Sequence, residues 1–456
     1  MDLFHDDLSG PELRGIYRKI WLLAWPVFLG QGLNSLVGFF ARMIVADLGE
    51  AAYNGVNIGM MVFFVIITLI ASIGVGTTSL VAQSWGRGDK KRAGEITQQS
   101  IVFGIVLALA ITVFGVLTHR FLYELMGTDA ETAKAGETFL LWLFAGVPLI
   151  APGFFLASAL RGAGDTITPM WAGAIMGLFS LFLAYGLILG NFGMPRLETM
   201  GAALAIDFSF ALFTSILAIV FFTNRVRIKL PLKGWRPHLP TGFSIFKIGI
   251  PSALEFILIQ AGILIYVSVM TNYGPEALAG YFTGMAFIML AQTPAFGIQA
   301  ASTTIIGQAV GAKDYRLAES AFRRAALLGF VLMTAIGLVM VVLVTPEALG
   351  FFFSELTQES ILYSRDFVII LTFVMPLMGV SFSIAGGLRG SGDTIWPLIA
   401  SATGVYGGRV LMAYGIYELF HPPVFLVWCS MFPDLILRIF IMAGRIKSGK
   451  WKSGRE

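Results

Sequence analysis

Apolar residues gather into twelve long runs along this chain, separated by short polar segments. A helix that crosses the hydrocarbon core of a bilayer needs about 20 mostly apolar residues. Every run is long enough, so the pattern predicts an all-α polytopic membrane protein with twelve transmembrane helices. The predicted spans are residues 17–46, 53–81, 97–118, 137–160, 167–190, 201–223, 242–270, 278–305, 324–345, 364–388, 396–418 and 424–444.

Proline and glycine recur inside these runs, as at Pro26, Pro148, Pro251, Pro294 and Pro376. In a membrane bundle, neighbouring helices satisfy the backbone groups that a proline frees. Small residues also let helix backbones approach closely. The prolines and the 52 glycines are therefore compatible with spanning helices.

Composition supports a membrane protein. Of 456 residues, 57% are hydrophobic and 13% are charged, whereas soluble domains carry about 25% charged residues. The single cysteine, Cys429, excludes a disulfide framework or a thiolate metal cluster within the chain. The polar start, Met1 to Glu12, leads into a full-length span, so we expect no cleavable signal.

Lysine and arginine predict the orientation. With a cytoplasmic N-terminus, the cytoplasmic segments hold 23 of the 31 Lys and Arg residues, and the opposite loops hold four. Basic loops are retained on the cytoplasmic side. We therefore expect a protein of the plasma (inner) membrane with both termini in the cytoplasm. We interpret the basic runs as topology signals and lipid-headgroup contacts rather than as a ligand site. The net charge of +4 does not indicate a nucleic-acid partner.

The chain contains an internal repeat. A shift of 225 residues brings Pro26 onto Pro251, and further on a shift of 228 brings segment 160–166 onto segment 388–394. Two six-helix halves in the same orientation form two lobes related by pseudo-two-fold symmetry about the membrane normal, as in transporters whose lobes rock around a cavity. The predicted parts are an N-terminal lobe of residues 1–223, a basic cytoplasmic linker of 224–241, and a C-terminal lobe with a basic tail of 242–456.

Both halves carry an Arg-Gly-x-Gly-Asp-Thr segment after their fourth helix, at Arg161–Thr166 and Arg389–Thr394. Together with the loops 81–86 and 306–311 and the stretch 249–255, this pairing resembles the multidrug and toxic compound extrusion (MATE) family. The resemblance implies a proton- or sodium-coupled antiporter that exports amphipathic or cationic organic compounds by alternating access. Its partners would be a small organic substrate and the bilayer, with no cofactor besides the coupling ion, and we expect a monomer.

Other functions have weaker support in the sequence. The loop Gly86–Arg92 loosely resembles that of a major-facilitator transporter, which stays an alternative, as does a lipid-precursor flippase of the same wider superfamily. An ATP-driven pump is not supported, because Trp451 follows the phosphate-loop-like segment 444–450 where Ser or Thr is needed. The four histidines are scattered, so we expect no enzyme.

The paired turns contain four charged residues that we interpret as structural or gating residues. Their glycines allow a sharp reversal of the chain at positive φ. The aspartates can cap the next helix, and the arginines can pair with carbonyls or with the aspartates. These residues are Arg161, Asp165, Arg389 and Asp393.

An ionisable group within a membrane span is a functional hypothesis by default, because it is costly there. Glu255, four residues after Pro251, is the first candidate for the coupling cation or a cationic substrate, with a possible sodium site beside it. The alternative is a structural pair with Lys247 or Arg409. Asp207 is a second candidate, and its alternative is a structural pair across helices.

Arg409 is a deep cation that needs a partner, for which we expect Glu255 or Asp434. Asp434 and Arg438, four residues apart, predict a local pair. The third group of candidates is neutral residues that could line a cavity, with helix packing as the alternative for each. These are Asn34, Asn57, Gln260, Tyr266, Tyr281, Gln292 and Gln299.

The chain also departs from the family it resembles. One branch uses an aspartate in its first and fifth helices, where this chain has Ala41 and Ala184, with Arg42 beside the first. The tenth-helix aspartate of sodium-type members is missing from 377–380. The seventh-helix glutamate of many members falls at Ile259, one turn beyond Glu255. The comparison moves the expected coupling chemistry to the second lobe.

Overall fold

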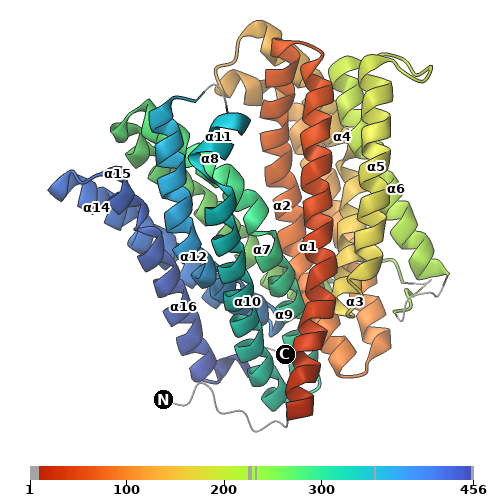
Figure 1. The fold of residues 1–456 in the computed structure, drawn as a ribbon. Helices are drawn as coiled ribbons and strands as arrows, with labels where there is room; N and C mark the ends of the chain where they lie inside the picture. Colours follow the sequence, from red (N-terminus) through yellow and green to blue (C-terminus); the bar gives the residue numbers. More distant parts are fainter. Residues whose placement is uncertain (1–9, 224–227, 232–233, 354–355, 453–456) are drawn as a thin grey trace. The chain divides into compact units, whose positions relative to one another are not determined.

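In a computed structural model, residues 10–223, 228–231, 234–353 and 356–452 are described. Helices account for nearly all of them, and these residues contain no strand (Figure 1). The elements are α1 (Gly10–Ala46), α2 (Glu50–Gly86), α3 (Lys90–Leu125), α4 (Ala130–Gly162), α5 (Ile167–Leu189), α6 (Glu198–Phe222), α7 (Leu239–Met270), η1 (Thr271–Tyr273), α8 (Pro275–Ala291), α9 (Thr293–Gly311), α10 (Tyr315–Leu343), α11 (Pro346–Phe352), α12 (Gln358–Gly390), α13 (Ile395–Ala402), η2 (Thr403–Val410), α14 (Leu411–Phe420), α15 (Val424–Trp428), α16 (Met431–Lys447) and η3 (Lys450–Lys452).

The predicted all-α membrane class is confirmed. Among the described helices, ten are long and apolar enough to cross a membrane, and the bent pair α8 and α9 passes the same test when its two helices are taken together. The run of α13, η2 and α14 occupies the predicted helix 396–418. Each of the twelve predicted runs therefore corresponds to a helix or to a broken helix.

Three predicted helices are interrupted. The expected helix 278–305 bends by 42° between α8 and α9, where Pro294 cannot donate a backbone hydrogen bond. The hydroxyl of Thr293 donates to the carbonyl of Leu290 at this break (2.9 Å). The eleventh run passes through a π-helix, η2, and the twelfth breaks between α15 and α16. The short α11 was not predicted.

The chain divides into two compact units. Residues Leu29–Gly249 form one, here the N-unit; residues up to Phe28 together with those from Ile250 onward form the other, the C-unit. The chain passes from one to the other within α1 and α7, close to the repeated Pro26 and Pro251. The units thus assign residues 1–28 and 242–249 differently from the lobes expected from sequence, whose boundaries stay a prediction.

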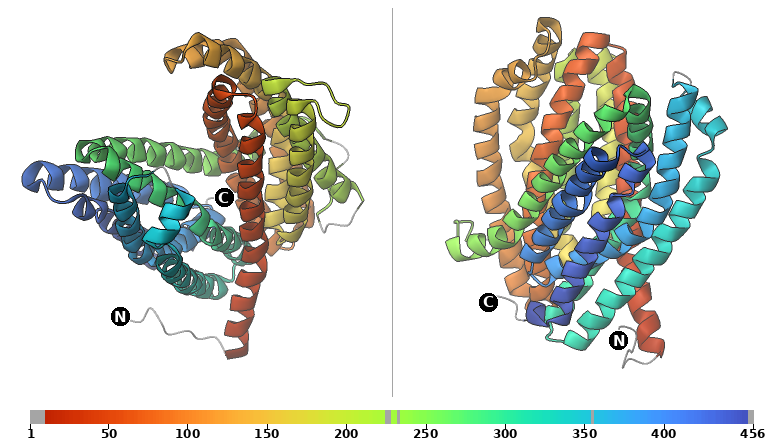
Figure 2. Two further views of the ribbon diagram at one scale, coloured as in Figure 1. Left: turned by 45° about the horizontal axis from the view of Figure 1, so that its top comes forward. Right: turned by 90° about the vertical axis from the view of Figure 1, so that its left-hand side faces the viewer.

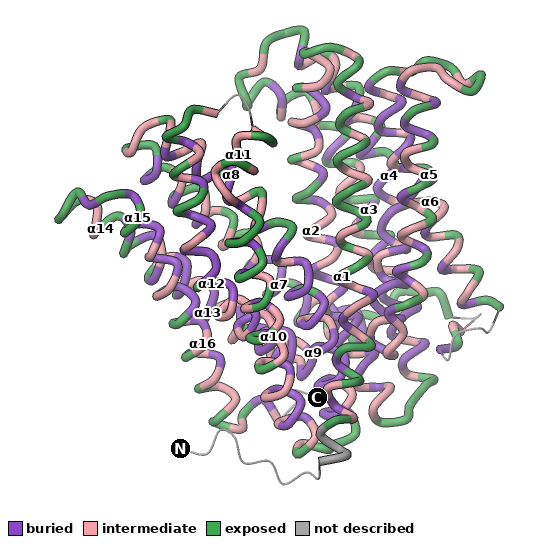
Figure 3. Tube along the Cα trace, viewed as in Figure 1, coloured by how far each residue is buried: buried purple, intermediate pink, exposed green. Residues whose placement is uncertain are grey.

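Each unit is built around one central helix. In the N-unit, α4 lies against α2, α3 and α6, and these helices run alongside one another in the views of Figures 1 and 2. In the C-unit, α12 lies against α8, α9, α10 and α16. The most apolar window of each central helix is 61% buried, against 17–44% for the other spanning helices (Figure 3). The two central helices are counterparts in the repeat.

The repeated loops also have repeated geometry. Asp89 and its counterpart Asp314 cap α3 and α10 by accepting from the backbone N–H three residues ahead. Gly164 and Gly392, in the two Arg-Gly-x-Gly-Asp-Thr turns, have φ of 91° and 88°. A side chain would be strained at such φ, which explains why both turns have glycine there.

The predicted linker 224–241 is partly described; residues 224–227 and 232–233 of it lie outside the described residues. Its described part is tied to α3. Gln99 donates to the carbonyl of Arg236 (3.0 Å) and accepts from the N–H of His238 (2.8 Å). Gln98 donates to the carbonyl of Pro231 (3.1 Å). Two neighbouring side chains of α3 therefore satisfy backbone groups of the irregular segment.

A hydrogen bond across helices compensates for a proline in α4. Pro148 lacks the N–H that would bond to the carbonyl of Phe144, and the hydroxyl of Thr112 on α3 donates to that carbonyl instead (2.7 Å). A carbonyl left without a donor in apolar surroundings would cost several kcal/mol. Thr112 is therefore placed to stabilise the α3–α4 packing.

We expect Thr112→Val to lower the free energy of unfolding by about 1–3 kcal/mol, because it leaves the Phe144 carbonyl without a donor. The measurement is the midpoint of thermal unfolding in detergent micelles. In a Pro148→Ala background the restored N–H can bond to Phe144, so Thr112→Val should matter less there. Thr118→Val, which removes a bond within one helix, is the control. Equal losses in the two backgrounds would contradict this account.

Candidate functional site

Glu255 is buried in the C-unit with two partners. It lies in α7, one turn after Pro251, and its residue is 4% exposed. Its Oε2 accepts from Nη2 of Arg389 at 2.8 Å, and its Oε1 accepts from the hydroxyl of Ser401 at 2.8 Å. The carboxylate thus joins α7 to the end of α12 and to α13.

This pairing corrects one expectation. We expected the structural alternative for Glu255 to be Lys247 or Arg409, but the partner is Arg389, from the second Arg-Gly-x-Gly-Asp-Thr turn. The guanidinium of Arg389 reaches α7 because it leaves α12 in the last turn of that helix. A residue interpreted as part of a turn therefore contacts the first candidate ion site directly.

A second charged cluster in the C-unit consists of Asp434, Arg409 and Arg438. Oδ2 of Asp434 lies 2.8 Å from Nη2 of Arg409, and its Oδ1 accepts from Nε of Arg438 at 2.6 Å. The predicted Asp434–Arg438 pair is confirmed, and so is Asp434 as the partner of Arg409. The side chain of Asp434 is 0% exposed, and those of Arg409 and Arg438 are 13% and 9% exposed.

The π-helix η2 brings this cluster together. Gly404 and Gly408 face α16, where a Cβ at Gly404 would lie 2.5 Å from Oδ1 of Asp434 and one at Gly408 would lie 2.6 Å from its Cα. Only glycine lets the two backbones approach so closely. The hydroxyl of Tyr406, also in η2, donates to the carbonyl of Leu258 in α7 (3.0 Å). Single-turn π segments are frequent at functional sites.

The two repeated turns have different contacts. In the C-unit, Asp393 accepts from Nε of Arg445 at 2.6 Å, and the Arg445 guanidinium lies 5.1 Å from the ring of Trp396. In the N-unit, Asp165 accepts from the N–H (2.9 Å) and the hydroxyl (2.6 Å) of Thr168, in the first turn of α5. Arg161 donates to the hydroxyl of Ser158 (3.0 Å).

Asp207 lies in α6 of the N-unit, and its residue is 3% exposed. The structural pair that we considered for it is not formed with any described residue, and its Oδ1 has no hydrogen-bond partner among them. Its carboxyl packs against the backbone of Gly146 in α4, where a Cβ would lie 2.0 Å away. Ala184, at one of the positions where the resemblance suggests an acid, is also buried in this unit.

The neutral candidates separate into two groups. Tyr266 and Tyr281 are buried, their ring centroids lie 5.9 Å apart, and the guanidinium of Arg409 lies 5.8 Å from the Tyr266 ring. The structure therefore joins these two to the Asp434 cluster. The five asparagine and glutamine candidates are half-buried or exposed. They are Asn34, Asn57, Gln260, Gln292 and Gln299.

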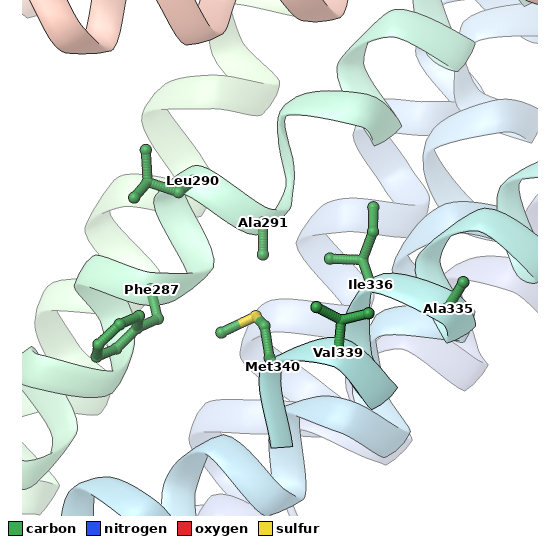
Figure 4. A pocket seen from close by; sticks show the side chains of 7 residues that line it. All are labelled: Phe287, Leu290, Ala291, Ala335, Ile336, Val339 and Met340. Atoms are coloured by element: carbon green, nitrogen blue, oxygen red, sulfur yellow. The ribbon is translucent and has the colours of Figure 1, made fainter. Parts of the chain in front are cut away.

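No group of three His, Cys, Asp or Glu side chains that could hold a metal ion occurs among the described residues. One apolar hollow of about 390 Å³ lies in the C-unit between α8 and α10 (Figure 4). Its lining contains no ionisable side chain, so it is separate from the charged clusters. The lining residues are Phe287, Leu290, Ala291, Ala335, Ile336, Val339 and Met340.

Two glycines of η2 provide a test of the cluster. We expect Gly404→Ala to destabilise the protein by about 1–3 kcal/mol, because its methyl group would overlap Asp434 and Arg438. Gly407→Ala in the same π-helix is the matched control, since its Cβ would meet nothing within 4 Å. Thermal unfolding in detergent measures both. Equal midpoints for the two variants would contradict the close packing of η2 on α16.

Comparisons with known proteins identify one family of transporters over most of the chain. The family model MatE matches residues 26–186 and 251–414. A relative from Thermotoga maritima, called a probable multidrug resistance protein NorM, is 26% identical over 99% of this chain and 96% of its own length. The probable multidrug resistance protein YoeA of Bacillus subtilis is 25% identical, over 91% of this chain and 89% of its own.

Solved structures show the same fold. A transporter of the MOP superfamily from Pyrococcus furiosus, described as having a binding pocket of reverse polarity, has a TM-score of 0.88 at 22% identity and covers 98% of this chain and 100% of its own. An outward-facing multidrug resistance MATE transporter has the same TM-score and identity, over 98% and 99% of the two chains. The two matched segments of the family model cover most of both halves, and the chain belongs to the MatE family.

Proposed function

We propose that this protein is a cation-coupled antiporter that exports amphipathic or cationic organic compounds across the plasma membrane in exchange for protons or sodium. The names of the relatives, multidrug resistance proteins, support the substrate class. The observation that carries the coupling is the buried Glu255, held by Arg389 and Ser401. Family membership also removes the major-facilitator alternative.

Competition for one carboxylate gives a physical basis for the coupling. Glu255 can pair with Arg389, or it can take a proton or a sodium ion, but a single carboxylate cannot satisfy both cations fully. Carboxylate and hydroxyl oxygens are the ligands that hard cations take, and Glu255 and Ser401 supply both kinds. Binding of the ion therefore weakens the link to Arg389, and re-formation of the ion pair expels the ion.

Arg389 connects this exchange to the rest of the C-unit. It occupies the last turn of α12, the central helix of the unit, and its Nε has no hydrogen-bond partner among the described residues. Without Glu255, the guanidinium would be left in apolar surroundings without its carboxylate, which is unfavourable. Ion binding at α7 would therefore shift the free-energy balance between arrangements of α7 and α12, as a two-state transporter requires.

Asp207 supports a second ion site in the N-unit. A carboxylate that is buried without a partner is too costly to keep its charge, so it takes up a proton. Asp207 is 3% exposed and unpaired among the described residues. We propose it as a site that holds an exchangeable proton. The distribution of Lys and Arg supports cytoplasmic termini in the inner membrane, which completes the proposal together with a monomeric state.

The coupling role predicts that Glu255→Gln lowers gradient-driven export of a cationic dye from proteoliposomes by at least about tenfold, which corresponds to ~1.4 kcal/mol. Glutamine preserves size but cannot take up the proton or neutralise sodium. Imposed proton and sodium gradients are applied separately, and they identify the ion. Glu418→Gln, at an exposed position, is the control. Dye movement unaffected by either gradient would overturn the antiport proposal.

Arg389→Gln tests the competition itself. Without its rival, the ion should bind more easily, so transport should reach half its maximal rate at a lower concentration of the coupling ion. The dependence of the initial rate on ion concentration measures this shift. An unchanged half-saturating concentration would make Arg389 a packing residue and not a competitor.

Asp207→Asn gives an independent result. If Asp207 holds an exchangeable proton, this variant should transport fewer protons per dye molecule, measured with a pH-sensitive probe inside the vesicles. Binding of the dye should persist. An unchanged proton-to-dye ratio would return Asp207 to a packing role beside Gly146.

A further inference from the structure

The Asp434 cluster carries an excess of positive charge. Asp434 provides one negative charge, and Arg409 and Arg438 each provide one positive charge. Among the described residues no second carboxylate lies within ion-pair distance of either arginine. Glu255, the other buried carboxylate of this unit, is engaged by Arg389. The cluster therefore keeps a net charge of about one positive unit, since arginine stays protonated in proteins.

Such a charge is expensive in a membrane-spanning segment. Arg409, Arg438 and Asp434 all lie in predicted spans, and the three side chains are at most 13% exposed. Charged groups inside a membrane are rare and are usually paired or functional. An ion pair alone would need only one of the two arginines. The second arginine therefore points to a negative group that is not part of the described chain.

Exposure indicates which side of the cluster a ligand can reach. The carboxylate of Asp434 is fully enclosed, whereas Arg409 retains the largest exposed fraction of the three. A ligand that approaches the cluster therefore meets a guanidinium and not the carboxylate. This order favours an anion over a cation.

Two buried groups of this cluster have unused hydrogen-bond donors. Nε of Arg409 is buried without a partner among the described residues, and so is the hydroxyl of Tyr281, whose residue is 1% exposed. The Tyr281 ring lies against that of Tyr266, which in turn lies 5.8 Å from the Arg409 guanidinium. Buried donors are almost always satisfied in native proteins. Nε of Arg409 can only donate and the Tyr281 hydroxyl is able to donate, so an anion, which accepts hydrogen bonds, could satisfy both groups.

We propose that Arg409, supported by Arg438 and Tyr281, forms a binding site for a monovalent anion within the C-unit. The shared chemistry is a single negative charge that accepts several hydrogen bonds: a free halide, or the carboxylate of a transported organic compound. This site is distinct from Glu255, which would take the cation. A protein with both sites would bind zwitterionic or acidic amphipathic compounds as well as cationic ones.

The test measures binding of radioactive chloride and, separately, radioactive benzoate to the purified protein by equilibrium dialysis, with sulfate, which is divalent, to hold the ionic strength constant. The wild type should bind one of them saturably. Two single variants, Arg409→Gln and Arg438→Gln, each reduce the cluster to zero net charge. Each should weaken binding by about tenfold or more. Arg365→Gln removes an exposed arginine of the same unit and should leave binding unchanged.

Asp434→Asn separates a binding role from a structural one. It raises the net charge of the cluster, so it should bind the anion at least as tightly as the wild type, although it breaks the Asp434–Arg409 pair that Arg409→Gln breaks and the Asp434–Arg438 pair as well. Should this variant not fold, Asp434→Asn with Arg438→Gln restores a net charge of one and should bind. Equal loss of binding in Asp434→Asn and Arg409→Gln, or no saturable binding to the wild type, overturns the proposal.

The two radioactive anions distinguish the sources. Chloride that binds without competition from benzoate supports a free inorganic ion. Benzoate that competes with chloride supports the carboxylate of an organic compound. Neither measurement uses a gradient or transport, so failure of the anion site and failure of the antiport proposal remain distinguishable.

Discussion

The C-unit depends on one constraint: a carboxylate buried among apolar helices needs an arginine within hydrogen-bond distance. Three ion pairs connect different segments of this unit, from Glu255 to Arg389, from Asp393 to Arg445, and from Asp434 to Arg409. Each joins segments far apart in the sequence, so each fixes a relation that apolar packing alone leaves free. The N-unit contains a different solution. Oδ1 of its buried Asp207 has no hydrogen-bond partner among the described residues, and a carboxyl group in such a position escapes the cost of a buried charge only when it is protonated. The two halves therefore share a fold but handle buried charge differently.

Repeated residues provide the frame within which these differences arise. Both Arg-Gly-x-Gly-Asp-Thr turns reverse the chain through a glycine at positive φ, and both central helices contain the repeated proline. The aspartates of the two turns differ in their contacts: Asp165 accepts from Thr168 in the next helix, whereas Asp393 accepts from Arg445 in α16. The glycine at positive φ thus gives the two turns the same backbone conformation. The charged side chains of the turns are not bound by that requirement, and their contacts differ between the two units.

Hydropathy and the repeat were sufficient to predict the helical class, the positions of the twelve runs and the two similar halves, because membrane spans impose length and apolarity directly on the sequence. The Asp434 pairs were also predictable, since Arg438 is four residues away on the same helix and Arg409 had few acidic candidates. The partner of Glu255 was not, because Arg389 is 134 positions away in the sequence and only the folded chain brings the two side chains together. The breaks at Gln292 and in η2 were missed for a related reason: proline and glycine permit an irregular backbone without requiring it.

The π-helix has a consequence for any residue-by-residue mapping of the eleventh run. A regular α-helix rotates by about 100° per residue. In a π-helix the hydrogen bonds span five residues, so each turn holds more residues and the rotation per residue is smaller. Positions after Val410 therefore lie on a different face from the one that a single helical wheel through 395–420 assigns. A cysteine-labelling scan interpreted with one continuous period would produce a false stripe along α14. The counterpart of the eleventh run in the first half is α5, an uninterrupted helix of 23 residues, and a single helical wheel describes all of it. Superposition of the two halves at the level of single side chains must therefore stop at η2 and begin again, with a new phase, beyond it.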